Sequence, residues 1–271
     1  MADVAARRDE RGITIQRVGV KDVHLPVQVR RKEGGFVPVL GRVNLSVELP
    51  HVHRGTHMSR LLDVLFRWSQ QPIAASDLVS ILEEARRRLH ARRAEMELAF
   101  KYFVQKRAPV SRIASPLDYD CRFGGRLADG EYDFTLGVEV PVTCLCPCSR
   151  EIARYGAHNQ RAMIRVAVRY ADKRMLWLED LIEKVEQQGS APIYPLLKRA
   201  DEKHVTEQAY ENPKFVEDML RDVVAVVRAD PRITWFEAEC ESMESIHNHS
   251  VYARQRERRR PDGGWQAIDE E

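Results

Sequence analysis

Cysteine and long apolar runs are both scarce in this sequence. Five cysteines occur among 271 residues, and neither their odd number nor their spacing fits a disulfide framework, which excludes a small disulfide-stapled scaffold. No apolar run approaches the roughly 20 residues of a membrane-spanning helix, and no apolar signal-peptide core follows Met1. We therefore expect a soluble protein of a reducing compartment, most simply the cytoplasm, with no membrane as partner.

An excess of charge of one sign is missing as well. Lys and Arg number 43 and Asp and Glu 41, which leaves a formal net charge of +2. Such a balance gives no global reason to expect nucleic acid as a partner. The hydrophobic fraction of 44% is ordinary, so the chain should bury a sizeable core in one large domain or two smaller ones.

Three of the few cysteines are concentrated in one short segment. Cys144, Cys146 and Cys148 alternate with other residues, and His158 follows after a turn. Thiolate and imidazole are ligands that zinc and related transition metals prefer. The same two groups can equally serve a cysteine nucleophile. A third interpretation, in which the cysteines are small buried hydrophobic residues, is open at this point.

Hydrophobic periodicity divides the chain into two halves with the same order of elements. Alternation with period two predicts strands, and spacing of three to four residues predicts helices. In the first half we expect a hairpin, two helices and two more strands, at 23–29, 37–49, 61–68, 78–89, 96–104 and 117–123. In the second half we expect the same order at 132–144, 162–170, 178–185, 215–227 and from 233 towards 251.

This repeat predicts an α+β protein of two tandem ββααββ units. The charged, aperiodic start at 1–12 is expected to be a flexible tail, followed by a first unit at 13–128. A second unit at 129–256 carries the cysteine segment and most of the candidate site, and 257–271 forms another tail. Little residue identity links the halves, so the repeat is one of element order alone.

Histidines and arginines near residue 55 offer further candidates. His51, His53 and His57 lie in a strand-to-helix junction, where they could bind a metal or simply be solvated. Beside the start of the same helix, Arg54 and Arg60 could bind an anion such as phosphate or pair with acidic neighbours.

A second acid- and histidine-rich segment lies near the end of the chain. Glu237, Glu239 and Glu241 share one face of an expected strand, and His247 and His249 share a face beyond it. Metal ligands, acid–base groups and a solvated strand edge all fit this pattern.

Five motifs, distributed in order along most of the chain, resemble those of one known family. They are HRGTHMSR at His53–Arg60, CPCSREI at Cys146–Ile152, YGAHNQR at Tyr155–Arg161, NPKFVED at Asn212–Asp218 and ESIHNHS at Glu244–Ser250. Together they resemble type IB GTP cyclohydrolase I, a prokaryotic family distinct in sequence from the type IA enzyme. Each motif alone would be weak, but the set is specific.

The resemblance implies a fold, an assembly and a reaction. The family has the tunnelling fold, in which two tandem units with antiparallel sheets assemble into barrels, and its chains form homotetramers with active sites at interfaces. Its reaction converts GTP and water into 7,8-dihydroneopterin 3'-triphosphate and formate, the first step of folate and pterin biosynthesis. This implies a hydrolase with GTP as substrate and one divalent metal ion, Zn, Mn or Fe, in each active site.

The resemblance also implies roles for particular residues. Catalytic roles fall on Cys146, His158 and His247. Metal ligation falls on Cys146, His158, Glu202 and His247, with Asp201 as an alternative to its neighbour Glu202. A carboxylate at Glu217 would bind guanine, because it can accept paired hydrogen bonds from N1–H and the 2-amino group.

Other residues of the motifs have less defined roles. Cys148 could be a second thiol near the site or could cap the turn, and the role of Cys144 is open. Cys121 and Cys240 are expected to be buried structural residues. Charge alone suggests triphosphate contacts for Lys198, Arg199, Lys203 and Arg161.

Three alternatives stand beside this hypothesis. The first is an archaeal-type relative that prefers iron and yields a cyclic-phosphate product, and only product analysis separates the two. The second is a silent protein that binds a purine or pterin, against which the joint presence of the five site residues argues. The third is a structural zinc module, which would need four ligands at recurring Cys-x-x-Cys spacing that the sequence does not supply.

Overall fold

The computed structural model describes residues 5, 7–73, 77–170 and 175–269. Part of the predicted N-terminal tail, residues 1–4 and 6, therefore lies outside the described residues. The chain divides into two compact units, one made of 1–101 and 122–136 and the other of 102–121 and 137–271. The boundaries predicted at 12, 128 and 256 stay predictions.

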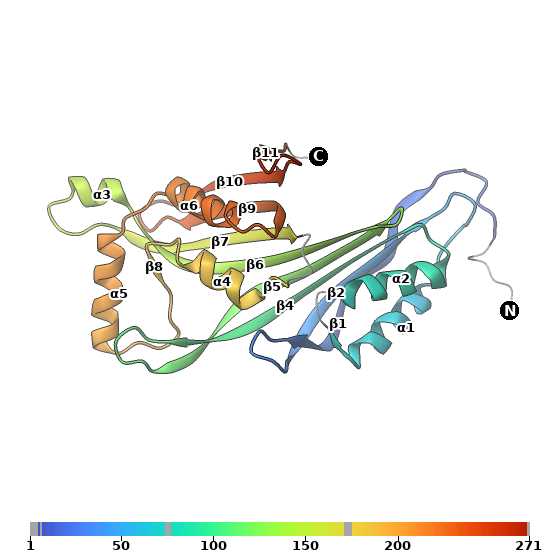
Figure 1. The fold of residues 1–271 in the computed structure, drawn as a ribbon, viewed down its shortest axis with the longest axis horizontal. Helices are drawn as coiled ribbons and strands as arrows, with labels where there is room; N and C mark the ends of the chain where they lie inside the picture. Colours follow the sequence, from blue (N-terminus) through green and yellow to red (C-terminus); the bar gives the residue numbers. More distant parts are fainter. Residues whose placement is uncertain (1–4, 6, 74–76, 171–174, 270–271) are drawn as a thin grey trace. The chain divides into compact units, whose positions relative to one another are not determined.

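Strands dominate the architecture (Figure 1). They are β1 (Ile15–Arg30), β2 (Phe36–Leu49), β3 (Pro72–Ile73), β4 (Arg93–Arg107), β5 (Ala114–Ala128), β6 (Glu131–Leu145), β7 (Asn159–Tyr170), β8 (Ala191–Pro192), β9 (Ile233–Met243), β10 (Ser250–Arg259) and β11 (Trp265–Ala267). They form one eleven-stranded sheet in the order β11-β10-β9-β7-β6-β5-β4-β2-β1-β3, with β8 paired to β6. The sheet is mixed, because β3 pairs with β1 in parallel whereas β1 and β2 are antiparallel.

The fold-class prediction is therefore wrong. It was two tandem ββααββ units with antiparallel sheets that assemble into barrels, whereas the described strands belong to a single mixed sheet. The physical reason lies in β4, β5 and β6, which have 15 residues each and contribute residues to both units. In the described residues β5 and β6, which lie on either side of the unit boundary predicted at 128, are neighbours in that sheet.

In the first unit the predicted hairpin is confirmed. Val29 faces Val37 and Val27 faces Val39 across the antiparallel pair of β1 and β2. Gly34 forms the turn with a φ of 91°, a left-handed conformation that glycine adopts without a steric penalty. Two helices, α1 (Met58–Ser69) and α2 (Leu78–Leu89), bury one apolar stripe each, made of Leu61, Val64, Leu65, Leu78, Ile81 and Leu82.

In the second unit β7 and β9 form the central antiparallel pair, with Ala162 opposite Ser242. The helices are α3 (Pro147–Ile152), α4 (Leu178–Glu186), α5 (Arg199–Glu211) and α6 (Val216–Arg228). Helix α6 lies against β9 and β10 and buries Val216, Met219, Val223 and Val227. Among the helices that the structure describes, none is both long enough and apolar enough to cross a membrane.

The last strands extend beyond residue 256. Glu257 on β10 is buried and accepts two hydrogen bonds from the Arg228 guanidinium of α6, one of them 2.8 Å long. On β11, the Trp265 ring packs edge-on against Phe236 with 5.2 Å between ring centroids. These contacts attach part of the predicted C-terminal tail to the second unit.

Candidate active site

At the end of β6 the chain turns, and hydrogen bonds among Cys146, Ser149 and His158 close this turn, which we call the cysteine corner. Cys146 is the residue before α3, and its thiol accepts a hydrogen bond from the Ser149 N–H at 3.4 Å. Its own N–H donates to the His158 carbonyl at 3.1 Å. The His158 N–H in turn donates to the Ser149 hydroxyl at 3.1 Å. The structure thus brings Cys146 and His158 together through Ser149.

The three cysteines of this segment lie in different environments. Cys144 is buried, Cys146 is half-buried and Cys148 is exposed. Burial raises the pKa of the Cys144 thiol to about 11, although hydrogen bonding to Ser242 opposes the rise. Cys121 and Cys240 are buried as predicted. Of the three, Cys146 is the one that combines partial exposure with contact to the His158 backbone.

The imidazole of His158 belongs to a polar network that crosses from β7 to β9. Its Nδ1 lies 2.8 Å from Oε1 of Gln160 and 4.0 Å from a carboxylate oxygen of Glu244. Nε2 of Gln160 donates to Ser242 Oγ and to Glu244 Oε1, both at 3.1 Å. Sequence reasoning missed these three partners. Gln160 and Glu244 lie within the matched motifs, but their meeting depends on the register between two strands.

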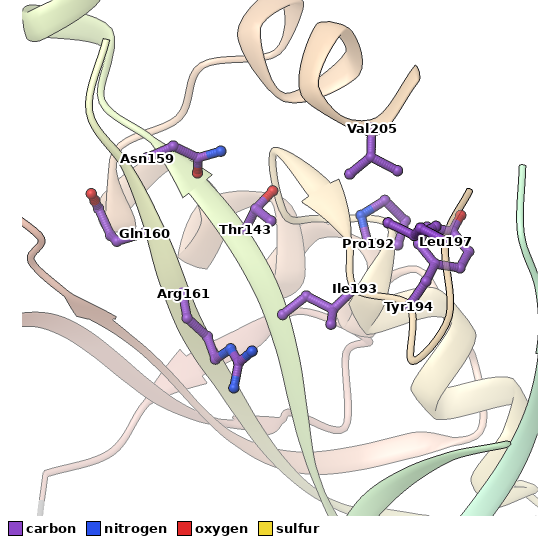
Figure 2. A pocket seen from close by; sticks show the side chains of 9 residues that line it. All are labelled: Thr143, Asn159, Gln160, Arg161, Pro192, Ile193, Tyr194, Leu197 and Val205. Atoms are coloured by element: carbon purple, nitrogen blue, oxygen red, sulfur yellow. The ribbon is translucent and has the colours of Figure 1, made fainter. Parts of the chain in front are cut away.

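A pocket of about 390 Å³ opens beside this network (Figure 2). Its lining residues are Thr143, Asn159, Gln160, Arg161, Pro192, Ile193, Tyr194, Leu197 and Val205. Gln160 and Arg161 are neighbours on β7 and point to opposite sides of the strand, with Arg161 on the side of Ile193. Gln160 links the pocket to the His158 network: it is one of the lining residues, but its side chain points to the face of β7 opposite Arg161 and joins that network.

A buried lysine anchors the loop that forms the opposite wall of the pocket. Lys106 Nζ pairs with the Glu186 carboxylate, donates to the Ile193 carbonyl at 2.7 Å and lies 4.4 Å from the centroid of the Tyr194 ring. The Tyr119 hydroxyl donates to the same carboxylate at 2.9 Å. Burial lowers the pKa of Lys106, against the opposing effect of Glu186. The ammonium thus connects β4, α4 and the pocket wall.

Helix α5 places the two adjacent acids in different environments. Asp201 is fully buried and accepts hydrogen bonds from the backbone N–H groups of Val110, Ser111 and Lys198 and from the Ser111 hydroxyl. Burial raises the pKa of this carboxyl, but those hydrogen bonds outweigh it and hold the pKa well below its usual range. Glu202 is exposed on the same turn. Asp201 therefore has a structural role, and Glu202 is the acid of this pair that solvent or a ligand can reach.

The connection before α6 is hydrogen-bonded to the end of β6 and to the residues before β8. The Lys214 N–H donates to the Leu145 carbonyl at 3.0 Å, one residue before Cys146. The Asn212 amide donates to the carbonyls of Gly189 and Ser190, both at 3.1 Å. Glu217 follows in the first turn of α6 and is exposed.

The predicted metal ligands do not form one cluster in the described chain. His247 and His249 are exposed in the connection between β9 and β10, with their rings stacked 5.2 Å apart. In the part of the chain that the structure describes, no group of three or more His, Cys, Asp or Glu side chains could hold a metal ion. The structure therefore joins Cys146 to His158 but does not add Glu202 and His247 to them.

Other candidate residues form ion pairs. On β9, Glu239 and Glu241 both accept from the Arg165 guanidinium, at 2.9 and 2.8 Å. Glu237 accepts from Arg254 at 2.7 Å and from Arg256 at 2.8 Å. This acidic face is thus neutralised by arginines of the neighbouring strands β7 and β10, and β9 is paired on both sides, so it is not the solvated strand edge that the sequence left open. In the first unit His51 and His53 are exposed.

Solved structures identify the class of fold. The uricase of Arthrobacter globiformis aligns with a TM-score of 0.54 at 8% identity, covering 91% of this chain and 94% of that chain. A hyper-thermostable AgUricase mutant aligns with a TM-score of 0.57 at 9% identity, covering 90% and 92%. At such low identity the likeness shows the fold alone. The protein thus has a uricase-like fold, which replaces the predicted pair of ββααββ units, and its His158 imidazole is hydrogen-bonded to Gln160, one of the residues that line a pocket.

Sequence relatives then identify the family. The family described as "Type I GTP cyclohydrolase folE2" matches residues 1–253. GTP cyclohydrolase FolE2 of Pelobacter propionicus is 52% identical over 253 residues, which cover 93% of this chain and 97% of that protein. The protein of the same name from Geobacter sulfurreducens is 51% identical, with 93% and 96% covered. The chain belongs to the type I GTP cyclohydrolase FolE2 family, which confirms the predicted GTP cyclohydrolase I, a hydrolase of the folate pathway.

Proposed function

We propose that the corner of Cys146 and His158, with the pocket beside it, is where this enzyme opens the guanine ring of GTP. The observation that carries the proposal is the set of hydrogen bonds among Cys146, Ser149 and the backbone of His158, which holds the two residues next to one another. The adjacent pocket, about 390 Å³, falls in the size range of small-molecule sites. The products would be 7,8-dihydroneopterin 3'-triphosphate and formate.

The chemistry requires water to add at C8 of guanine and protons to move during hydrolysis of the formamide. The His158 imidazole is the candidate for proton transfer, because histidine titrates closest to neutral pH. The Cys146 thiol, half-buried at the same corner, is the second catalytic candidate. His247 stays a proposal as the third, on the strength of its motif.

We include one divalent metal ion, Zn, Mn or Fe, in the proposal, with Cys146, His158, Glu202 and His247 as ligands. Thiolate and imidazole suit zinc, and carboxylate with imidazole also admits manganese or iron. Within the described residues of one chain the four ligands do not come together. Glu202 and His247 are exposed and so accessible to another protomer, and the proposal includes a homotetramer in which a second protomer completes the site. The type IB assignment and a cytoplasmic location belong to the same proposal.

Substrate recognition would rest on Glu217 and Arg161. The exposed Glu217 carboxylate can accept the paired N–H donors of guanine. Arg161 lines the pocket and is exposed, so its guanidinium can bind a phosphate. Lys198, Arg199 and Lys203 are further exposed cations around the start of α5.

The role of Glu217 is tested by Glu217→Gln. The amide presents a donor where guanine also presents donors, so we expect the affinity for GTP to fall roughly 10- to 100-fold, as for the loss of a charged hydrogen bond. Isothermal titration with GTP measures this, and Glu183→Gln, an exposed acid on α4, is the control. Equal affinity for GTP in the two variants would show that Glu217 does not bind guanine.

The overall proposal is tested by adding GTP and manganese, zinc or iron in turn to metal-stripped protein. We expect dihydroneopterin, followed by fluorescence after oxidation, and an equal amount of formate. Mass spectrometry of the product distinguishes a linear triphosphate from a cyclic phosphate. Retained GTP binding without formate release under all three metals would contradict the proposed metal-dependent reaction.

A further inference from the structure

The two nitrogens of the His158 imidazole have different surroundings. Nδ1 faces the side chain of Gln160, which is itself bonded to Ser242 and Glu244 on the neighbouring strand. His158 and Glu244 have side chains only 13% and 11% exposed, so these contacts are largely shielded from water. The network is therefore able to fix which nitrogen carries the proton.

The chain of hydrogen bonds has one orientation, set by Glu244. An ionised carboxylate only accepts hydrogen bonds, so the amide end of Gln160 that faces Glu244 Oε1 must be its NH₂ group. The Ser242 hydroxyl donates to the same carboxylate oxygen at 3.0 Å and so can accept from Gln160. The carbonyl end, Oε1, then faces His158, and the Ser245 hydroxyl also donates to it at 3.4 Å.

This orientation determines the tautomer of His158. Oε1 of Gln160 is an acceptor, so the nitrogen 2.8 Å from it must be the donor. Nδ1 therefore carries the hydrogen in the neutral imidazole, and Nε2 carries the lone pair. We propose that Gln160 and Glu244 are positioning residues that hold His158 as the Nδ1–H tautomer and leave Nε2 free to accept a proton or bind a metal. The catalytic part of this inference rests on the function proposed for His158.

Glu244 acts on the imidazole through Gln160. It determines the direction of the amide, and the amide determines the direction of the Nδ1–H bond. The isosteric variant Glu244→Gln removes the acceptor-only constraint while keeping the side-chain shape. The Gln160 amide can then turn its NH₂ towards Nδ1, which favours the Nε2–H tautomer. Gln160→Leu removes the acceptor altogether.

The test is ¹⁵N NMR of metal-stripped enzyme labelled at its histidine rings, at about pH 8.5, where an ordinary histidine is neutral. A His158→Asn variant assigns the His158 signals. We expect Nδ1 of His158 to be the protonated nitrogen in the wild type. In both Glu244→Gln and Gln160→Leu the preference for the Nδ1–H tautomer should be lost. Glu239→Gln, on the same strand but paired with Arg165, is the control and should keep the wild-type pattern. An Nε2–H signal for wild-type His158 would overturn the inference.

Kinetics test the positioning role separately. Loss of a group that orients a metal-ligating histidine typically costs about 10- to 100-fold in activity or metal affinity. Because His158 is proposed as such a ligand, we expect kcat of Glu244→Gln to fall by about that factor, with KM for GTP nearly unchanged. A changed tautomer with unchanged kcat would overturn the positioning role and the function proposed for His158, while the tautomer assignment stands. An unchanged tautomer in Glu244→Gln would overturn the role of Glu244 whatever its activity.

Discussion

Asp201 binds Ser111 twice. Its Oδ1 accepts the Ser111 N–H at 2.8 Å, and its Oδ2 accepts the Ser111 hydroxyl at 2.6 Å. The two residues are 90 positions apart in sequence, and the contact attaches the turn between β4 and β5 to the first turn of α5. Because Glu202 is the next residue, this buried contact also fixes the position of the Glu202 backbone, which carries the exposed carboxylate.

Asp201→Ala should therefore destabilise the protein and weaken activity indirectly. The change leaves buried donors of Val110, Ser111 and Lys198 without their acceptor, which is costly. We expect the melting temperature to fall by roughly 5 °C or more. Differential scanning fluorimetry measures this, with Glu202→Ala as the exposed control. Equal melting temperatures for the two variants would contradict the structural role of Asp201.

Cys146→Ala should abolish turnover without unfolding the chain. The thiol lies at the proposed reaction corner, whereas the backbone hydrogen bond from Cys146 to His158 survives the change. We expect kcat to fall by roughly 10³-fold or more, as for other catalytic residues, with the circular dichroism spectrum unchanged. Cys148→Ala is the matched control, because Cys148 is exposed and has no assigned role. Full activity of Cys146→Ala would exclude the residue from catalysis.

Strong alternation of apolar and polar residues made much of the first unit predictable. The valines at 27, 29, 37 and 39 specify both the strands and their pairing, because a shift by one residue would turn the apolar face outwards. The apolar stripes of α1 and α2 were equally clear. By contrast, β3 and β8 have two residues each, too few for any periodicity to be visible.

Helix α5 and the His158 network could not be read from the sequence for different reasons. Arg199–Glu211 buries only Asp201 and Ala209, so it lacks the apolar stripe that identifies a helix. Gln160 and Glu244 are 84 residues apart, and only the register of β7 with β9 brings them together. The motif positions Cys146 and His158 were visible, but the partners that orient them depend on tertiary structure.

Lys106 and Glu186 should behave as a buried pair in a double-mutant cycle. Lys106→Met leaves the Glu186 carboxylate buried without its cation, so we expect a loss of about 3–5 kcal/mol in the free energy of unfolding. The double variant Lys106→Met/Glu186→Met removes both charges and should lose less than Lys106→Met alone. Urea unfolding measures both, and Lys203→Met, an exposed lysine paired with Glu207, should change little. A double variant at least as unstable as the single one would contradict the pairing.

Stability should decline at alkaline pH partly through Cys240. Burial raises the pKa of this thiol to about 12, with further contributions from Cys144 and Glu239, whereas an unfolded cysteine ionises near about pH 8.5. Because the folded pKa is the higher one, the contribution of the neutral thiol to the free energy of unfolding is complete below about pH 8.5 and is lost as the pH rises towards 12.

Urea unfolding at pH 8 and pH 10 tests this contribution. Between these values the wild type should lose about 2 kcal/mol more of its free energy of unfolding than Cys240→Ala does, since only the wild type has this thiol to ionise in its unfolded state. The comparison between variants cancels the titration of lysines and tyrosines over the same range. Cys148→Ala removes an exposed thiol and should keep the wild-type loss. If Cys240→Ala lost as much of its free energy of unfolding as the wild type, burial would not raise the pKa of the Cys240 thiol.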